Sequence, residues 1–450
     1  MTQQGVRWTA DQVLALAPDA ASRKAGSKLG AAGPWSEAGS SDEGTVWGLC
    51  KGSGSKPYQT VVDIADAAGP AYKCSCPSRK FPCKHALGLL LLWAADEAAV
   101  PPGRAPEWAA QWAAGRRERS EAKKAGAGSA PSGSVDPEAA RRRAERRAER
   151  VSAGAVELEQ RLVDLLRGGL ATAEQSGYGL WEETAARMVD AQAQGLAGRV
   201  RELGAIPSTG PGWPVRLLEE CALLHLLGRG WQRRERLPAG LAATVRSRMG
   251  LPSSADGPPL RDHWLVLAQY DTTDPRLTTR RIWLHGAASH RTVLLLSYGA
   301  AGRAPELALP VGLSLEAEVS AYPGTGQPRV ALGEQFAAPA PAAIRPPGMT
   351  TAQAAARYGG ALREDPWLES VPVTLDRVVP TPDGDSWQLA DADGDAALPL
   401  TPAARSRPGL WRLVALSGGA PVRVFGECGH QGFAPLTAWP EGPGDAVALC

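Results

Sequence analysis

The sequence predicts an α+β protein of several domains: a small β/α module, a helical middle domain and an antiparallel β-rich C-terminal half. Residues 74–85 hold three of the seven cysteines and one of the six histidines. Between 151 and 250 the apolar residues recur with a helical period, and from about residue 262 they alternate with a period of two. The expected domains are therefore 1–100, 151–250, 260–340 and 350–450, with a flexible charged linker at 101–150.

The first module is predicted to be a small sheet with helices at both ends. A short helix begins after Thr9, a suitable N-cap, and ends before Pro18. Three strands and a buried helix follow, with a hairpin loop at 52–57 between the first two strands. The expected strands are 46–50, 58–64 and 72–76, and the helix is 86–93.

A set of four metal-ligating side chains joins the third strand to this helix. Cys74 and Cys76 form a C-x-C pair, which an extended segment points to one side. Cys83 and His85 form a C-x-H pair after a six-residue spacer. Three thiolates and one imidazole in two pairs are typical of a tetrahedral zinc site, and four protein ligands leave no open position. We therefore expect one zinc ion with a structural role.

The segment 74–85, Cys-Ser-Cys-Pro-Ser-Arg-Lys-Phe-Pro-Cys-Lys-His, resembles the SWIM-type zinc finger, whose pattern is C-x-C, a variable spacer and C-x-H. The segment 48–58, Gly-Leu-Cys-Lys-Gly-Ser-Gly-Ser-Lys-Pro-Tyr, adds to the likeness to bacterial SWIM zinc finger proteins. The similarity is strongest in residues 1–100. It implies zinc binding, and it associates the finger with DNA binding or protein binding without choosing between them.

Lysines gather around the finger although the chain as a whole carries a net charge of only +2. Two interpretations remain open. The ammonium groups offset the net negative charge of three thiolates on one zinc ion, or they form a surface for phosphate or for an acidic partner. The lysines in question are Lys51, Lys56, Lys73, Lys80 and Lys84.

The linker is predicted to be flexible at 125–134, which is rich in Gly, Ala and Ser. A capped, strongly charged helix begins at Asp136 and is expected to be solvated, with a nucleic-acid contact as the other interpretation. The middle domain then has four expected helical segments. They are centred on 158–166, 180–203, 217–225 and 237–249.

The C-terminal half is predicted to be two β-rich modules separated by a proline-rich break at 339–347 and a helix at 350–362. The first has strands expected at 263–270, 278–284, 291–297, 315–321 and 329–332. The second has strands expected at 371–379, 386–390, 410–416 and 421–426. No internal repeat is evident.

Other patterns that resemble sites are given structural interpretations. Cys221 and His225 lie among leucines without a third ligand, which favours core packing. The segment 391–395 lacks the glycine and glutamate positions of a calcium loop, which favours a turn. Cys428 and His430 lack a partner pair, so a second zinc site is not expected. No nucleophile motif of a hydrolase occurs.

These features predict a cytoplasmic, non-enzymatic protein. No signal peptide is visible, and the longest apolar run, 86–95, is too short for a membrane span. The favoured function is a scaffold or adaptor that binds a protein or a nucleic acid. A DNA-binding regulatory protein is the alternative, and an accessory or cryptic enzyme in the C-terminal half is a further one. A protein partner is expected, DNA is possible, and no membrane contact is expected.

Overall fold

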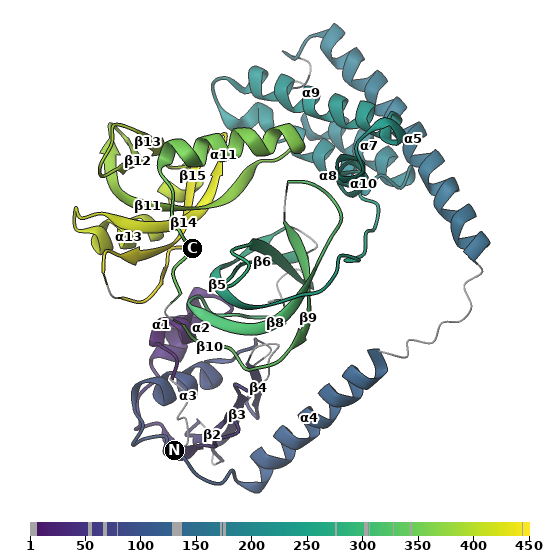
Figure 1. Ribbon diagram of the computed structural model, residues 1–450. Helices are drawn as coiled ribbons and strands as arrows, with labels where there is room; N and C mark the ends of the chain where they lie inside the picture. The colour runs from purple at the N-terminus through teal and green to yellow at the C-terminus, as the bar shows by residue number, and fades with distance from the viewer. Residues whose placement is uncertain are drawn as a thin grey trace.

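The computed structural model describes residues 7–52, 56–65, 70–78, 80–127, 137–171, 173, 177–274, 277–300, 305, 307–326, 328–342, 344–442 and 444–450. An N-terminal module lies at one end of the molecule and a helical bundle at the other (Figure 1). Two β-barrels lie between and beside them. The mixed α+β class and the antiparallel sheets that the sequence predicts are confirmed. Within the described residues, every helix is too short or too polar to span a bilayer.

The N-terminal module is a four-stranded antiparallel sheet covered by helices. Its strands are β1 (Trp35–Ser40), β2 (Thr45–Cys50), β3 (Tyr58–Asp63) and β4 (Ala71–Cys74), in that spatial order. Its helices are α1 (Ala10–Leu14), α2 (Ala20–Ser27) and α3 (Lys84–Ala95). The predicted cap is confirmed, because Thr9 and Gln12 form a capping box. Strand β1 and helix α2 were not predicted from the sequence.

Helix α3 is the core of this module. Its residues 85–93 are all buried, so it is apolar around its whole circumference, as a helix covered on every side must be. Two glycines allow α2 and the turn after it to pack closely against α3. A Cβ on Gly88 would lie 2.5 Å from the Leu29 Cβ, and one on Gly26 would lie 2.7 Å from the Leu87 Cβ.

The segment predicted as a flexible charged linker at 101–150 contains two long helices within the described residues. Helix α4 (Glu107–Ala127) and helix α5 (Pro137–Gly168) account for most of it. Ala109 of α4 packs against Trp47 and Val61 of the sheet, which orders the start of α4. Helix α5 continues through the boundary predicted at residue 150. Most of the Gly/Ser stretch predicted to be flexible at 125–134 lies outside the described residues.

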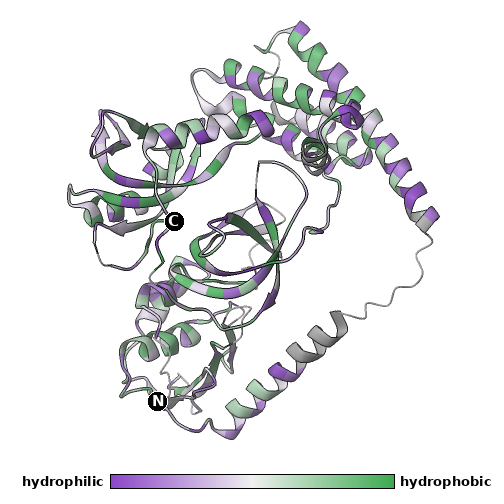
Figure 2. Cartoon of the chain, in the orientation of Figure 1, coloured by the Kyte–Doolittle hydropathy of each residue, from purple (hydrophilic) through white to green (hydrophobic). Residues whose placement is uncertain are grey.

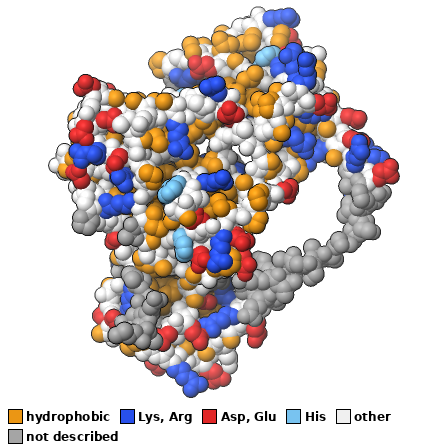
Figure 3. Space-filling view, in the orientation of Figure 1, with side chains coloured by type: hydrophobic (Ala, Val, Ile, Leu, Met, Phe, Trp, Pro, Cys, Tyr) orange, Lys and Arg blue, Asp and Glu red, His pale blue; other side chains and the backbone are white. Residues whose placement is uncertain are grey.

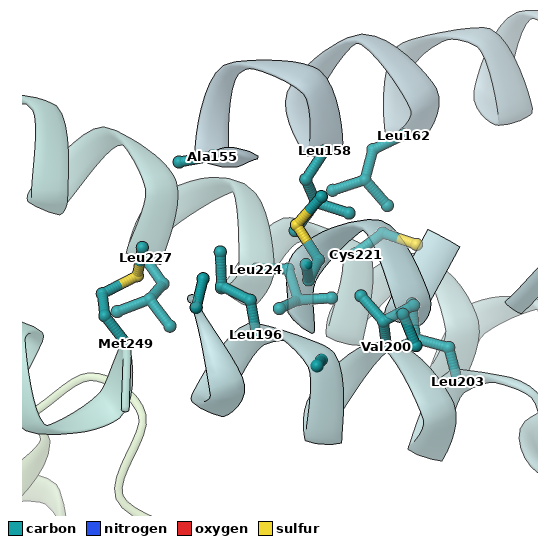
Figure 4. Close-up of a cluster of buried hydrophobic side chains, with 14 of the residues drawn as sticks. Ala155, Leu158, Leu162, Leu196, Val200, Leu203, Cys221, Leu224, Leu227 and Met249 are labelled. Atoms are coloured by element: carbon teal, nitrogen blue, oxygen red, sulfur yellow. The ribbon is translucent and has the colours of Figure 1, made fainter. Parts of the chain in front are cut away.

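The bundle consists of α5 with α7 (Gly177–Asp190), α8 (Gln194–Leu203), α9 (Trp213–Gln232) and α10 (Ala239–Arg248). Figure 4 shows Leu158 and Leu162 of α5 pointing into the same core as Leu224 of α9 and Leu196 of α8. The single segment predicted at 180–203 is two helices, since Gln192 has a φ of 60° between them. The N-terminal part of α5 is mainly hydrophilic (Figure 2), as the charged sequence indicates.

The first barrel contains β5 (Leu260–Thr273), β6 (Leu277–Gly286), β7 (Thr292–Ala300), β8 (Leu313–Ala321) and β9 (Arg329–Gln335), with the short β10 (Ala340–Pro341) at its edge. The order is β8-β5-β6-β7-β9, and a β8–β9 pairing closes it into a barrel. The β7–β9 pair is parallel, unlike the antiparallel arrangement predicted throughout. If β5 to β9 are numbered from one to five, the order of the strands around the closed barrel is 1-2-3-5-4-1.

The second barrel repeats this order. Its strands are β11 (Ser370–Asp383), β12 (Ser386–Asp391), β13 (Ala397–Pro399), β14 (Val422–Gly429) and β15 (Gly432–Pro440), followed by β16 (Val447–Ala448). The sheet order is β13-β12-β11-β14-β15-β16, and a parallel bridge between Leu400 and Phe433 links its third and fifth strands. The chain therefore contains a structural repeat that its sequence does not reveal.

Three helices accompany the second barrel: α11 (Thr351–Glu364), α12 (Pro402–Arg405) and α13 (Gly409–Ser417). The helix predicted at 350–362 is confirmed by α11. The strand predicted at 410–416 is wrong, because this segment is α13. Its buried side chains include Leu410, Leu413 and Ser417, which have a helical spacing. Gly418 ends the helix in the left-handed conformation with a φ of 52°.

The two barrels share an apolar interface. Leu265, Trp283 and Leu294 of the first barrel pack against the second, which contributes Phe425, Leu436 and Trp439. The Glu427 carboxylate lies among them. It accepts hydrogen bonds of 2.8 Å from the Tyr270 hydroxyl and of 2.8 Å from the Trp283 indole N–H. Part of the outer face of β5, β6 and β7 is therefore covered by the second barrel.

Candidate metal centre

The four predicted ligands come together at the junction of the sheet and α3. Cys74 is the last residue of β4, and Cys76 lies two residues beyond it. Cys83 is the N-cap of α3, and His85 lies in its first turn. The three Sγ atoms and one imidazole nitrogen all lie within 4.8 Å of one another. The end of a strand and the start of a helix thus bring the two ligand pairs face to face.

The spacing of the donor atoms fits zinc. Cys74 Sγ lies 3.7 Å from His85 Nδ1. A tetrahedral zinc with a Zn–S bond of about 2.3 Å and a Zn–N bond of about 2.1 Å places these two donors about 3.6 Å apart. Three soft sulfur donors and one imidazole also suit zinc better than the hard, oxygen-seeking cations.

Backbone N–H groups support the sulfur atoms. The N–H of Cys76 donates to the Cys74 sulfur, that of Ser78 to the Cys76 sulfur, and that of Ala86 to the Cys83 sulfur. The Thr60 hydroxyl on β3 lies 3.3 Å from Cys74 Sγ. Hydrogen bonds of this kind stabilise negative charge on sulfur and orient the ligands. The hydrogen bond from the Cys83 thiol is the main cause that lowers the pKa of Cys74.

The site is partly enclosed. Cys83 and His85 are buried, and Cys74 and Cys76 are half-buried. The Tyr58 ring lies 4.8 Å from the His85 ring, centroid to centroid, and restricts its orientation. Cys50 of β2 is a buried thiol near these residues, and its pKa is raised by burial and by the nearby Cys74. Thr60 and Tyr58 were not predicted, because their proximity depends on the register of β3 against β4.

The lysines near the finger are all exposed, which agrees both with a surface role and with a role in charge balance. They are Lys51, Lys56, Lys73, Lys80 and Lys84. Lys80 forms a 2.6 Å ion pair with Asp19 at the N-cap of α2. The hydrogen bonds from Lys80 and from Ser22 lower the pKa of Asp19 to about 2. One lysine of the five therefore links the finger to α2.

The other candidate sites do not form metal clusters within the described residues. Cys221 is buried in the bundle core, as predicted, whereas His225 turns outward and pairs with Glu159 at 3.1 Å. Asp391 accepts hydrogen bonds from Thr351 at the start of α11.

The remaining cysteine–histidine pattern is also not a site within that part of the chain. Cys428 is buried in the second barrel. The thiol of Cys450 lies 3.4 Å from the Gln269 carbonyl oxygen in the first barrel.

Comparison with known families gives two matches. Residues 61–94 match the SWIM zinc finger, and residues 146–249 match the SWIM-associated four-helix bundle domain. The first match contains all four ligands, and the second covers most of the bundle from α5 to α10. No curated protein and no solved structure matched the chain. The chain therefore contains a SWIM zinc finger, with its three cysteines and one histidine in place, followed by the SWIM-associated bundle.

Proposed function

We propose that the protein is a non-catalytic scaffold or adaptor whose zinc finger binds a protein partner. The closed set of four protein ligands carries this proposal. A catalytic zinc ion needs a coordination position for water or substrate, and a structural zinc ion does not. The metal therefore serves to fix the surface around β4 and α3.

A cavity whose lining includes the ligands Cys76, Cys83 and His85 supports a protein partner with an acidic segment. It lies between α2 and the finger and has a volume of about 580 Å³. Leu29, Tyr58 and Pro77 contribute apolar or aromatic surface, while Lys51 and Lys84 contribute exposed positive charge. An apolar side chain flanked by carboxylates would complement this lining.

A capture experiment tests this proposal. Zinc-loaded full-length protein serves as bait in native lysate, together with the charge-reversal variant Lys51→Glu/Lys84→Glu and the control Arg104→Glu. Arg104 is exposed and does not line the cavity. We expect the main partner to be retained by wild type and control and lost by the double lysine variant. Equal retention by all three baits, at equal zinc content, would contradict the proposed surface.

DNA binding by the same finger is the second candidate, and the five exposed lysines favour it. Affinity would come mainly from phosphate neutralisation and would fall steeply with salt. A mobility-shift assay of zinc-loaded protein at two salt concentrations is the test. The Lys51→Gln/Lys84→Gln variant should weaken a shift of double-stranded DNA at constant zinc content. Without a shift at micromolar protein and low salt, this candidate is eliminated.

A further inference from the structure

Two adjoining cavities lie where the helical bundle meets the first barrel. The first has a volume of about 310 Å³ and the second of about 450 Å³. They share Ser247, Ser253, Tyr322 and Arg329 in their linings. Figure 3 shows the surface hollowed between the bundle and the barrels. The cavities are far from the zinc finger, which lies at the opposite end of the molecule in Figure 1.

Four arginines from four different elements line these cavities. They are Arg147 of α5, Arg248 of α10, Arg281 of β6 and Arg329 of β9. The Nε atom of each of these four arginines is buried and has no hydrogen-bond partner within the described part of the chain. A buried guanidinium donor without an acceptor costs free energy, so four at one place indicate an acceptor that the chain itself does not supply.

Two of these arginines are already neutralised, and two are not. Arg248 pairs with Asp365 at 2.6 Å, and Arg281 lies 3.9 Å from Glu427. Within the described part of the chain, Arg147 and Arg329 have no carboxylate at ion-pair distance. Arg147 donates to the Gly250 carbonyl oxygen, and Arg329 lies over the Tyr322 ring.

The second cavity is the more favourable place for an anion. Asp365 and Glu369 line the first cavity. The described residues that line the second include no carboxylate. They include Arg147, Arg329 and the serines Ser247 and Ser253. Two guanidinium groups and two hydroxyls are the groups that bind phosphate oxygens.

The position of these cavities on the first barrel points to the kind of phosphate ligand. The closed strand order 1-2-3-5-4-1, with strands three and five parallel, is that of the OB-fold. Such barrels bind oligonucleotides on strands two and three and on the loops between strands one and two and between strands four and five. Here Arg281 lies on strand two, and Tyr322 to Thr325 form the loop between strands four and five.

Aromatic side chains lie on the same part of the barrel. Tyr322 lines both cavities. Tyr298 of strand three is 51% exposed and follows Leu296, the register partner of Arg281, by two residues, so it lies on the same side of the sheet. The second barrel covers the neighbouring Trp283 and Leu294. Tyr322 therefore lies with the arginines beside the bundle, and Tyr298 adds an exposed ring further along the same face, towards the end of strand three that is away from the bundle.

We propose that these cavities bind the sugar–phosphate backbone of a single-stranded nucleic acid. Arg147 and Arg329 bind phosphate oxygens from opposite sides, one from the bundle and one from the barrel. Bases stack on exposed tyrosine, which is how such barrels bind single strands with little regard to sequence. This binding is separate from that of the zinc finger, and it goes beyond the function proposed above.

Fluorescence anisotropy of zinc-loaded, full-length protein with a labelled oligothymidylate of about 12 nucleotides tests this proposal. The variant Arg147→Gln/Arg329→Gln should raise Kd about tenfold or more and lower the slope of log Kd against log salt by about 1.4, which is about 0.7 for each phosphate that is no longer neutralised. The matched control is Arg104→Gln/Arg357→Gln, which removes two exposed arginines outside both cavities. The control should bind like wild type.

Three results would overturn the proposal: no binding by wild type at micromolar protein and low salt, equal weakening by the control, or equally effective competition by adenosine monophosphate. The last result would indicate a nucleotide pocket instead of a strand-binding groove. Arg329→Lys should retain most of the affinity, which separates lost charge from misfolding. The Lys51→Gln/Lys84→Gln variant should leave single-strand binding unchanged, so failure of the finger proposal is distinguishable from failure of this one.

Discussion

At the scale of single residues, Cys74 and Cys83 come from the two ligand pairs. Elemental analysis should find about one zinc per chain in the wild type. The Cys74→Ser/Cys83→Ser variant should lose the metal, since hydroxyls are poor substitutes for thiolates. Because metal binding contributes to folding, the same change should also unfold the first module. A fully loaded double variant would show that the ion is bound elsewhere.

A second residue-scale prediction concerns His285 in the first barrel. Burial lowers the pKa of His285, and the neighbouring His290 lowers it further, while Asp262 opposes the shift. In the unfolded chain the pKa of His285 returns to about 6.5. At pH values between the lowered pKa of the folded protein and this value, the unfolded chain therefore binds more protons than the folded protein. The stabilising contribution of neutral His285 is therefore complete above about pH 6.5 and is lost as the pH falls below it.

Urea unfolding provides the measurement. Between about pH 7.5 and about pH 5.5 the midpoint of the wild type should fall, and that of His285→Gln should fall less, because the variant has no buried imidazole to protonate. Identical decreases in the two proteins would show that other groups control this pH range.

The residues around the metal also show what sequence can and cannot supply. Spacing alone identifies Cys74, Cys76, Cys83 and His85, because both pairs are local and their residue types are specific. Thr60 and Tyr58 touch the same site from another strand. Arg147 and Arg329 line one cavity from two different parts of the chain. Such contacts depend on pairing and packing between distant segments, and no spacing rule encodes them.

At the scale of elements, the contact between α2 and α3 depends on a missing side chain. A methyl group at Gly88 would overlap Leu29, so Gly88→Ala should destabilise the first module by about 1–3 kcal/mol. Gly359→Ala on α11 is the matched control. A Cβ there meets nothing within 4 Å, and alanine should stabilise the helix by about 0.5–1 kcal/mol. Thermal unfolding with zinc bound measures both. Equal effects of the two changes would mean that the close packing is unimportant.

The strands and helices were predictable to different degrees. Alternation located β5, β6 and β7 because one face of each strand points into the barrel. The apolar segment 410–416 was mistaken for a strand, since a short apolar run is compatible with either structure. The decisive feature is the exposure of Trp411 between the buried Leu410 and Leu413, a helical pattern that becomes visible only when the neighbours are in place.

At the scale of the whole molecule, Glu427 connects the two barrels. Replacing it with alanine leaves the Tyr270 hydroxyl and the Trp283 N–H without their acceptor, which should cost about 1–3 kcal/mol for each buried donor. Tyr270→Phe removes only one donor and keeps the Trp283 bond. We expect calorimetry to show a larger loss of barrel stability for Glu427→Ala than for Tyr270→Phe. A smaller loss would indicate that the apolar contacts alone hold the barrels together.

The repeated strand order of the two barrels was not predictable from the sequence, because it depends on contacts across the whole fold. Both barrels close through pairings between strands far apart in the chain, and the second has the helices α12 and α13 between its third and fourth strands. Strand order is a property of those long-range pairings, so two segments with different residues and different insertions can share it.

The first module also packs against a residue that is synthesised much later. Leu313 of the first barrel belongs to its hydrophobic core, and the Gln12 side chain donates to the Val311 carbonyl oxygen at 3.2 Å. On the ribosome, all four zinc ligands emerge before this segment exists. At about 5–20 residues per second, the interval between α3 and Leu313 lasts roughly 10–40 s. During that time a nascent, metal-competent finger displays an uncovered apolar patch, where a chaperone can bind until the barrel arrives.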